Sequence, residues 1–240
     1  MTVPDVEWVD DIDSTNAELL RRHRALPARF ALAARRQRAG RGRQGRHWLS
    51  PEGNLYLSVF ARLRTAAAGL SGMSLAVGIS VCEAVRARGI ERAQVKWPND
   101  LQVDGAKLGG VLIEIASAGS DGSAVVIGLG LNLAMPPDHA PDQAWTDLHQ
   151  LGIDVDPCTW ASCMTEAIVA AVDRFDAEGL DAFHDRWDAI DALRGRGVEV
   201  QGAQSVSGTA RGIDAHGALR VEHAGGMWLC RSGEVRVRAA

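Results

Sequence analysis

The chain has 240 residues, enough for one sizeable domain, or for one domain and a small appendage, around a real hydrophobic core. Its formal charge of −4 excludes a protein that coats nucleic acid with its whole surface. The sequence shows neither a leader segment nor an apolar stretch of membrane-spanning length, so we expect a cytoplasmic protein. The cysteines are scattered without the paired spacing of a zinc site: Cys82, Cys158, Cys163 and Cys230.

Two residue types are rare, and their positions are informative. Of the 26 basic residues only Lys96 and Lys107 are lysines. The ammonium group of lysine is a compact point charge, whereas the guanidinium group of arginine is planar and forked. A chain that otherwise uses arginine is therefore expected to retain lysine where a guanidinium group cannot replace it. Asparagine is equally sparse, at Asn16, Asn54, Asn99 and Asn132. We expect these positions to matter; a coding bias is the alternative explanation for part of the pattern.

The N-terminal part predicts a short strand and then a helix. The strand covers residues 6–9, and the helix opens at residues 13–16 and runs to about residue 23. Thr15 with Glu18 fits a capping box, in which the threonine hydroxyl accepts a backbone amide of the first turn. The cap is the favoured interpretation of these residues, although a helix N-terminus can also form a polar ligand pocket.

An arginine-glycine loop, residues 39–48 (AGRGRQGRHW), lies between predicted strands at residues 29–35 and 54–61. No acidic residue occurs between Glu18 and Glu52, so the positive charge is uncompensated in the sequence. Glycines let backbone amides face an anion, and guanidinium groups bind phosphate or carboxylate. The loop matches neither the P-loop nor the dinucleotide fingerprint. It therefore predicts an anion-binding flap over a sheet, with a nucleic-acid-binding segment as the alternative.

The middle of the chain predicts a core helix at residues 70–88, a short strand at 94–97 and a hairpin at 101–115 that turns at Asp104-Gly105. Lys107 in this hairpin is expected to meet a carboxylate or phosphoryl oxygen, or else to be solvated. Gly109 and Gly110 weaken the strand and suggest that something approaches its backbone closely. Asp100 either holds a cation such as Mg²⁺ between phosphates or serves only the turn.

The next strand, residues 124–133, ends at Asn132, whose amide donates either to a ligand or to its own backbone. Two amphipathic helices follow, the second carrying Leu180, Phe183, Trp187 and Ile190. From residue 194 onward glycines recur between short alternating runs, which predicts five strands in a small β-barrel. The expected domains are residues 1–193 and 194–240.

No nucleophile motif is visible in the sequence. Catalysis would then depend on positioning and charge stabilisation around phosphates, as in phosphoryl and adenylyl transfer.

These stretches together resemble the biotin–protein ligase family. The resemblance implies an α+β fold in which helices flank a mixed β-sheet, related to class II aminoacyl-tRNA synthetases, with a C-terminal SH3-like β-barrel. All the lysines and asparagines lie inside the matching motifs. These motifs are Ser14-Thr15-Asn16, Gln37 with AGRGRQGRHW, SPEGNLYLSVF (50–60), KWPNDL (96–101), KLGGVLIE (107–114), GLGLNL (128–133) and RGIDAHGAL (211–219).

The resemblance implies that biotin and MgATP form biotinyl-5′-AMP, from which biotin passes to a lysine of a biotin carboxyl carrier protein. Lys107 would neutralise the biotin carboxylate and the α-phosphate, and Arg43 would belong to the segment that closes over the adenylate. The implied biotin-binding residues are Ser14, Thr15, Asn16, Gln37, Arg41, Gly42, Arg43, Lys107 and Gly110. The implied nucleotide-side residues are Arg46, Trp48, Asp100, Asn132 and Trp145. Ligands for Mg²⁺ and the oligomeric state stay open.

Some family members carry an N-terminal DNA-binding domain. Only thirteen residues precede Ser14, so we expect a ligase that does not bind an operator and has no nucleic-acid partner. Because no apolar stretch is long enough to span a membrane, we expect no membrane partner either. Two alternatives are a lipoate-type ligase, which shares the reaction logic, and a non-catalytic nucleic-acid binder, against which the negative charge speaks.

Overall fold

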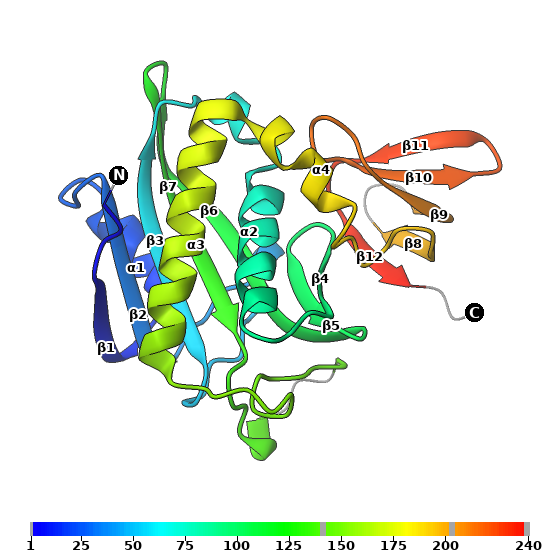
Figure 1. The fold of residues 1–240 in the computed structure, drawn as a ribbon. Helices are drawn as coiled ribbons and strands as arrows, with labels where there is room; N and C mark the ends of the chain where they lie inside the picture. The colour runs from blue at the N-terminus through cyan, green and yellow to red at the C-terminus, as the bar shows by residue number, and fades with distance from the viewer. Residues whose placement is uncertain (1, 140–142, 202–204, 238–240) are drawn as a thin grey trace.

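The computed structural model describes residues 2–139, 143–201 and 205–237. Its larger part is a seven-stranded sheet in the order β1-β2-β3-β7-β6-β5-β4 (Figure 1). β1 and β2 are parallel, and every other neighbouring pair is antiparallel. The strands are β1 (Val6–Ile12), β2 (Arg29–Gln37), β3 (Leu55–Leu63), β4 (Ala93–Lys96), β5 (Asp100–Val103), β6 (Ala106–Gly119) and β7 (Gly122–Leu131).

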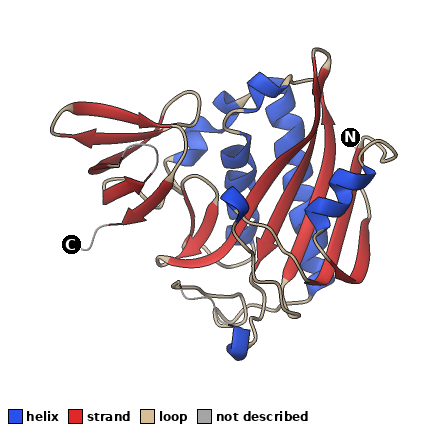
Figure 2. Cartoon of the chain, turned by 180° about the vertical axis from the view of Figure 1, so that it is seen from behind, coloured by secondary structure: helices blue, strands red, loops and turns tan. Residues whose placement is uncertain are grey.

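Helices cover both faces of this sheet, which confirms the predicted mixed sheet flanked by helices. α2 (Met73–Ala87) and α3 (Pro157–Glu178) lie on one face (Figure 1) and α1 (Thr15–Arg22) lies on the other (Figure 2). Side chains alternate along a strand, so β3 sends Leu57 into the core beneath α2 and α3 and Phe60 into a smaller cluster with Leu19 of α1. The α1 face therefore has the smaller apolar core and leaves room for polar groups.

The predicted core helix and the predicted hairpin are confirmed by α2 and by β5–β6. The hairpin turns at Asp104 and Gly105, both with positive φ, as its sequence predicts. A single helix through residues 180–190 is wrong: a 3₁₀ turn (Leu180–Phe183) is followed by the one-turn α4 (His184–Trp187). Apolar spacing did not reveal this break because both kinds of turn keep the same side chains on the buried side.

The C-terminal part forms five antiparallel strands, as predicted. They are β8 (Gly197–Gln201), β9 (Val206–Ile213), β10 (Leu219–His223), β11 (Gly226–Cys230) and β12 (Glu234–Val237). Their order is β11-β10-β9-β8-β12, and no pairing joins β11 to β12 within the described ranges. The predicted small β-barrel is therefore present as a five-stranded sheet domain whose outer strands do not pair among the described residues, and the predicted fold class is confirmed. Alternation identifies strands but does not tell whether the two outer edges meet.

The segment between the two sheets is fastened to the edge strand β4. Val95 pairs there with residues 190–192, since its N–H donates to the Ile190 carbonyl (2.8 Å) and its carbonyl accepts from the Ala192 N–H (3.0 Å). The buried Asp191 carboxylate accepts from the indole N–H of Trp187 (3.0 Å), and burial raises the pKa of this acid. In the described residues, no helix has the length and apolarity that a membrane crossing requires.

We predict that Trp187→Phe lowers the free energy of unfolding by about 2 kcal/mol, because the buried Asp191 carboxylate loses a donor. Urea denaturation measures this change. The half-buried Trp228 has no such bond among those described, so Trp228→Phe is the matched control and should cost less than half as much. Equal losses in the two variants would contradict the role given to the hydrogen bond.

Candidate active site

All the site residues predicted from the sequence line one cavity of about 610 Å³ on the α1 face of the large sheet. Its walls come from the N-terminus of α1, the loop after β2, the β5–β6 hairpin and the segment around residue 145. The predicted residues on the wall are Ser14, Thr15, Asn16, Gln37, Arg41, Gly42, Arg43, Arg46, Trp48, Asp100, Lys107, Gly110, Asn132 and Trp145. The structure thus brings together residues that lie more than 100 positions apart in the chain.

Glycines form the floor of the cavity. Gly110 on β6 and Gly130 on β7 are register partners, and Gly128 follows on the same face of β7. A Cβ atom at Gly130 would lie 2.5 Å from Cε2 of Trp48, and one at Gly128 would lie 2.4 Å from Oδ1 of Asn16. Only glycine at these two positions allows the two side chains to rest on the sheet. At Gly110 a Cβ atom would lie 3.4 Å from Cζ3 of the same Trp48 ring, so the predicted approach to this strand comes from Trp48.

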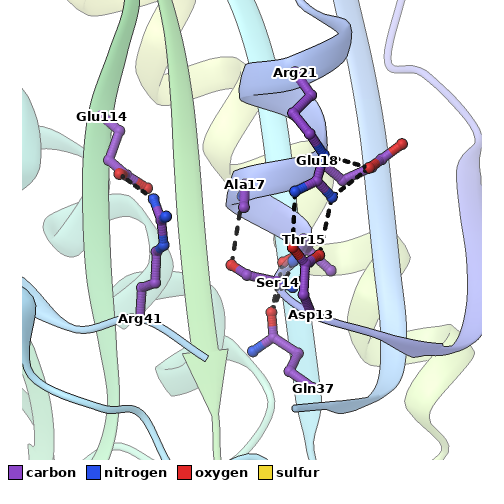
Figure 3. A network of polar contacts seen from close by, with 9 residues as sticks. All are labelled: Asp13, Ser14, Thr15, Ala17, Glu18, Arg21, Gln37, Arg41 and Glu114. Carbon is purple, nitrogen blue, oxygen red and sulfur yellow. Dashed lines mark hydrogen bonds and ion pairs between the residues drawn. The ribbon is translucent and has the colours of Figure 1, made fainter. Parts of the chain in front are cut away.

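Ser14, rather than Thr15, caps helix α1. The Ser14 hydroxyl accepts the backbone N–H of Ala17 (3.4 Å), as Figure 3 shows, so the predicted Thr15 cap is wrong by one residue. Thr15 already lies in the first helical turn, and its hydroxyl instead donates to Oε1 of Gln37 (3.1 Å). Gln37 thereby joins the end of β2 to the start of α1.

An ion-pair cluster supports this helix start from outside the cavity. Arg21 donates to both oxygens of Asp13 (2.7 and 2.9 Å) and to Glu18 (2.6 Å), as drawn in Figure 3. The side-chain hydrogen bond from Arg21 lowers the pKa of Asp13 to about 2. Asp13 therefore stays ionised at every physiological pH, and its Oδ1 accepts the Ser14 N–H (2.7 Å).

Gln37 and Ser50 connect the helix to the arginine-glycine loop. The amide group of Gln37 donates to the Ser50 hydroxyl (3.1 Å), which donates to the carbonyl of Trp48 (2.8 Å). The N–H of Trp48 in turn donates to the carbonyl of Gly40 (2.9 Å). The two ends of the loop are therefore held against each other beside the first turn of α1.

The charge of the loop is largely compensated through space, contrary to the expectation from sequence. β1 supplies Asp10 and Asp11 beside the arginines of β2 and the loop base, because the two segments run side by side. Arg41 pairs with Glu114 (3.2 Å) and Arg46 with Glu234 of the C-terminal sheet (2.9 Å). Acidic residues far away in the sequence thus provide the missing charge.

Arg43 differs from its neighbours because its partner is uncharged. Its guanidinium donates to the amide oxygen of Asn99 (3.3 Å), and burial lowers its pKa from the ordinary arginine value. The nearby Asp100 counteracts this shift. Arg43 therefore offers a half-buried positive charge that an incoming anion can bind without first displacing a carboxylate.

Lys107 points its ammonium group into the cavity. Its Nζ lies 2.9 Å from Oδ1 of Asp100 and 5.0 Å from the ring centroid of Trp48, and only 19% of its side chain is exposed. Burial lowers the pKa of the neighbouring Lys96. The two lysines of the chain thus face one carboxylate, at a place where a second anion would find positive charge.

Asn132 and Trp145 lie beside Lys107 for a structural reason. The Asn132 amide donates to the backbone carbonyls of Thr146 (3.0 Å) and Lys107 (3.3 Å), and Trp145 pairs with Lys107 through the backbone. These carbonyls lie 14 and 25 positions away in the chain, so the predicted alternative of a bond to its own backbone is not the one that forms. Through these bonds Asn132 holds Trp145 at the cavity wall.

Several residues of the site escaped the analysis of the sequence. Ser58 and Glu114 contact Asn16 from behind the cavity wall, and Tyr56 and Glu234 line the cavity itself. Ser58 is fully buried, and strand alternation could have placed it on the face opposite Leu57. Glu234 lies nearly 190 positions from the loop it contacts, and no pattern in the sequence predicts that pairing.

The described residues contain no group of three or more His, Cys, Asp and Glu side chains that could hold a metal ion. Asp100, the predicted magnesium contact, is already paired with Lys107.

Known proteins resemble this chain in both of its parts. Residues 8–132 match the model of the biotin/lipoate A/B protein ligase family, and residues 194–238 match the C-terminal domain of biotin protein ligases. The bifunctional ligase/repressor BirA of Escherichia coli is 40% identical over 233 residues, which are 95% of this chain and 73% of that protein. The chain belongs to the biotin protein ligase family.

Two further relatives support the assignment of this ligase. The biotin–[acetyl-CoA-carboxylase] ligase of Mycobacterium tuberculosis is 33% identical over 239 residues, which are 96% of this chain and 88% of that protein. The Aquifex aeolicus biotin protein ligase, solved in complex with biotin and ATP, superposes with a TM-score of 0.83 at 27% identity. That superposition covers 98% of this chain and 99% of the Aquifex chain.

We predict that Gly130→Ala weakens ATP binding about tenfold, because the new methyl group must push the Trp48 indole off the floor and away from Lys107. Isothermal titration calorimetry measures the affinity. Gly119→Ala is the matched control, since a Cβ at Gly119 meets only an ordinary contact at 3.9 Å. Unchanged ATP affinity in Gly130→Ala would contradict the proposed place of Trp48 beside the nucleotide.

Proposed function

We propose that this ligase activates biotin as biotinyl-5′-AMP inside the cavity and transfers biotin to a lysine of a biotin carboxyl carrier protein. One observation carries the proposal. A pocket of hydroxyl and amide groups at the start of α1 and the positive charge of Lys107 and Arg43 belong to the same cavity. A ligand with a polar head and a carboxylate tail can reach both ends of it. Residues 1–193 would form the catalytic domain, and residues 194–240 the C-terminal domain.

The biotin head would lie at the α1 end of the cavity. Biotin carries a cyclic urea, whose carbonyl accepts hydrogen bonds and whose two N–H groups donate them. Ser14 accepts from Ala17 and keeps its hydroxyl hydrogen for a ligand acceptor, and Asn16 keeps one lone pair on its amide oxygen. Thr15 and Gln37 complete this polar wall, and Gly42 and Gly110 allow the backbone to approach the ligand.

In the first step a carboxylate oxygen of biotin attacks the α-phosphorus of ATP. A new oxygen–phosphorus bond forms, the bond to the β-phosphate oxygen breaks, and pyrophosphate leaves with the electron pair. Lys107 would neutralise the carboxylate and the α-phosphate as they come together, with Arg43 beside it. Asp100 holds Lys107 in place until the anions arrive.

The nucleotide would occupy the other end of the cavity. Arg46 and Trp48 reach it from the loop, and Asn132 and Trp145 from the opposite wall. Mg²⁺ would enter with ATP as part of the substrate, because Asp100 is the one predicted protein contact and Mg²⁺ prefers phosphate and water oxygens.

In the second step the lysine amine of the carrier attacks the carbonyl carbon of the adenylate. An amide bond forms, AMP leaves with the bonding electrons, and the amine loses a proton. Before this step the segment Arg41-Gly42-Arg43 would have to cover the mixed anhydride against water, and then open for the lysine. The acetyl-CoA carboxylase named for the Mycobacterium relative supports a carboxylase carrier as the acceptor.

Biotin-dependent exchange of labelled pyrophosphate into ATP tests the proposal. We expect exchange with biotin and none with lipoate at equal concentration. Folded protein that binds both substrates but shows no exchange would refute the first step, and exchange that requires lipoate would identify a lipoate-type ligase. Label transfer to a purified carrier domain tests the second step.

We predict that Lys107→Ala lowers the exchange rate at least about 100-fold, because the cavity loses the ammonium group that lies against Asp100 where the two anions would meet. Arg92→Ala is the matched control: Arg92 pairs with Asp104 at the exposed turn of the same hairpin, outside the cavity, and its loss should leave the rate unchanged. An exchange rate within threefold of wild type in Lys107→Ala would contradict the role of Lys107.

We predict that Arg43→Gly increases release of the adenylate, since the loop loses the positive charge that faces the phosphate. Biotin labelling of an added bystander protein with exposed lysines, such as serum albumin, measures the release, and it should rise several-fold. Arg38→Ala serves as the control, because Arg38 pairs with Asp11 at the loop base, outside the cavity. Bystander labelling equal to that of wild type would show that Arg43 does not retain the intermediate.

A further inference from the structure

Glu114 contacts Asn16 and Arg41 from behind the biotin end of the cavity. Its Oε2 accepts from Nδ2 of Asn16 (2.8 Å), and its Oε1 accepts from Arg41 (3.2 Å), the pair drawn at the left of Figure 3. Glu114 lies on β6 and is not among the residues that line the cavity. Any effect on a ligand must therefore pass through the residues that it holds.

The amide of Asn16 has two possible orientations, and its neighbours decide between them. On one side lie the Glu114 carboxylate and, at 3.5 Å, the carbonyl of Leu112, which can only accept hydrogen bonds. On the other side lies the buried Ser58 hydroxyl, 2.6 Å from Oδ1 of Asn16 and 2.7 Å from Oγ1 of Thr15; a hydroxyl can donate or accept, so it fits the orientation that the first side requires. The NH₂ group of Asn16 must therefore point toward Glu114. In the flipped amide, Oδ1 of Asn16 would lie against the Glu114 carboxylate and the Leu112 carbonyl, and none of these three oxygens can donate a hydrogen bond.

This orientation leaves an acceptor at the cavity. Oδ1 of Asn16 rests on Gly128, where a Cβ atom would lie only 2.4 Å away, and both residues line the cavity. An amide oxygen has two lone pairs, of which Ser58 uses one. The second is free for a ligand N–H, such as one of those on the urea ring of biotin.

We propose that Glu114 is a positioning residue that fixes the Asn16 amide so that its oxygen faces the cavity and accepts a urea N–H. The proposal rests on the biotin site proposed above. It adds the residue that decides whether the Asn16 amide presents an acceptor or a donor to the ligand. Arg41 holds the second carboxylate oxygen, so the carboxylate keeps its orientation while the first oxygen serves Asn16. The carbonyl of Leu112 alone would fix the orientation of the Asn16 amide only weakly, since it lies 3.5 Å from Nδ2 of Asn16.

Glu114→Gln tests this role without changing the size of the side chain. A glutamine has one accepting end and one donating end, whereas Asn16 and Arg41 both require an acceptor. If the glutamine oxygen serves Arg41, its NH₂ group meets the Asn16 amide and favours the flipped orientation. We expect the Kd for biotin to rise about tenfold and the Kd for ATP to stay within twofold, both by calorimetry.

Exchanging the amide and the carboxylate between residues 16 and 114 should restore part of the affinity for biotin. Asn16→Asp alone places two carboxylates against each other and should weaken biotin binding. In Asn16→Asp combined with Glu114→Gln, the glutamine NH₂ donates to the aspartate, and an oxygen at residue 16 still faces the cavity. The double variant should therefore bind biotin more tightly than either single variant, a result that general damage to the fold would not produce.

Three outcomes would overturn the proposal: a wild-type Kd for biotin in Glu114→Gln, an equal rise for biotin and ATP, or additive losses in the double variant. Because these readouts are binding constants, they are independent of catalysis. Absence of pyrophosphate exchange in a wild-type protein that binds biotin would count against the proposed reaction and not against Glu114.

Discussion

The site depends on one bare patch of β-sheet. Gly110, Gly128 and Gly130 place three positions without side chains on the α1 face where β6 and β7 pair. The missing volume is filled from outside by the indole of Trp48 and the amide of Asn16, each resting directly on the backbone. Larger residues at these positions would lift both groups off the sheet and fill the cavity that they border.

Around this patch a continuous series of polar contacts connects one end of the arginine-glycine loop to Arg41 within the same loop. It passes from the Trp48 carbonyl through Ser50 and Gln37 to Thr15. It continues through Ser58, Asn16 and Glu114 and returns to the loop at Arg41. Hydrogen bonds in such a network orient one another, and a half-satisfied network is costly. The α1 end of the cavity and the arginine-glycine loop are therefore built as one unit.

The arginines of the loop differ in their partners: two are paired with carboxylates and hold the loop, and the third has no carboxylate partner in the described part of the chain and is available to a ligand. Arg41 and Arg46 are paired with carboxylates on β6 and β12, and these exposed ion pairs contribute little stability. They can exchange partners at small cost when an anion arrives. Arg43 has only an amide oxygen to release. The loop thus combines weak anchors with one half-buried charge, a combination that suits the flap role proposed for it.

Local patterns in the sequence were sufficient for most of the fold. Alternation predicted β3 and β7, and Asp104-Gly105 predicted the hairpin, because these signals lie within a few residues. The scarcity of lysine and asparagine, together with the family resemblance, predicted residues that the structure gathers around one cavity. Local evidence also favoured a helix start at residues 13–16, but it misplaced the cap by one residue.

The features that sequence reasoning missed depend on pairing across long separations. The acids of β1 neutralise arginines about 25 positions later only because β1 lies parallel to β2. Ser58 and Glu114 reach Asn16 from strands 42 and 98 positions away. The openness of the C-terminal sheet depends on whether its outer strands meet, and the spacing of glycines carries no information about that distance.

The central claim is that the loop and the start of α1 respond to ligand as one unit. Hydrogen–deuterium exchange, followed by mass spectrometry before and after addition of biotin alone, tests it most directly. The account predicts that peptides covering residues 13–18 and 39–49 gain protection together and at the same biotin concentration, while β10 and β11 stay unchanged. Protection confined to residues 13–18, with no change in the loop, would contradict it.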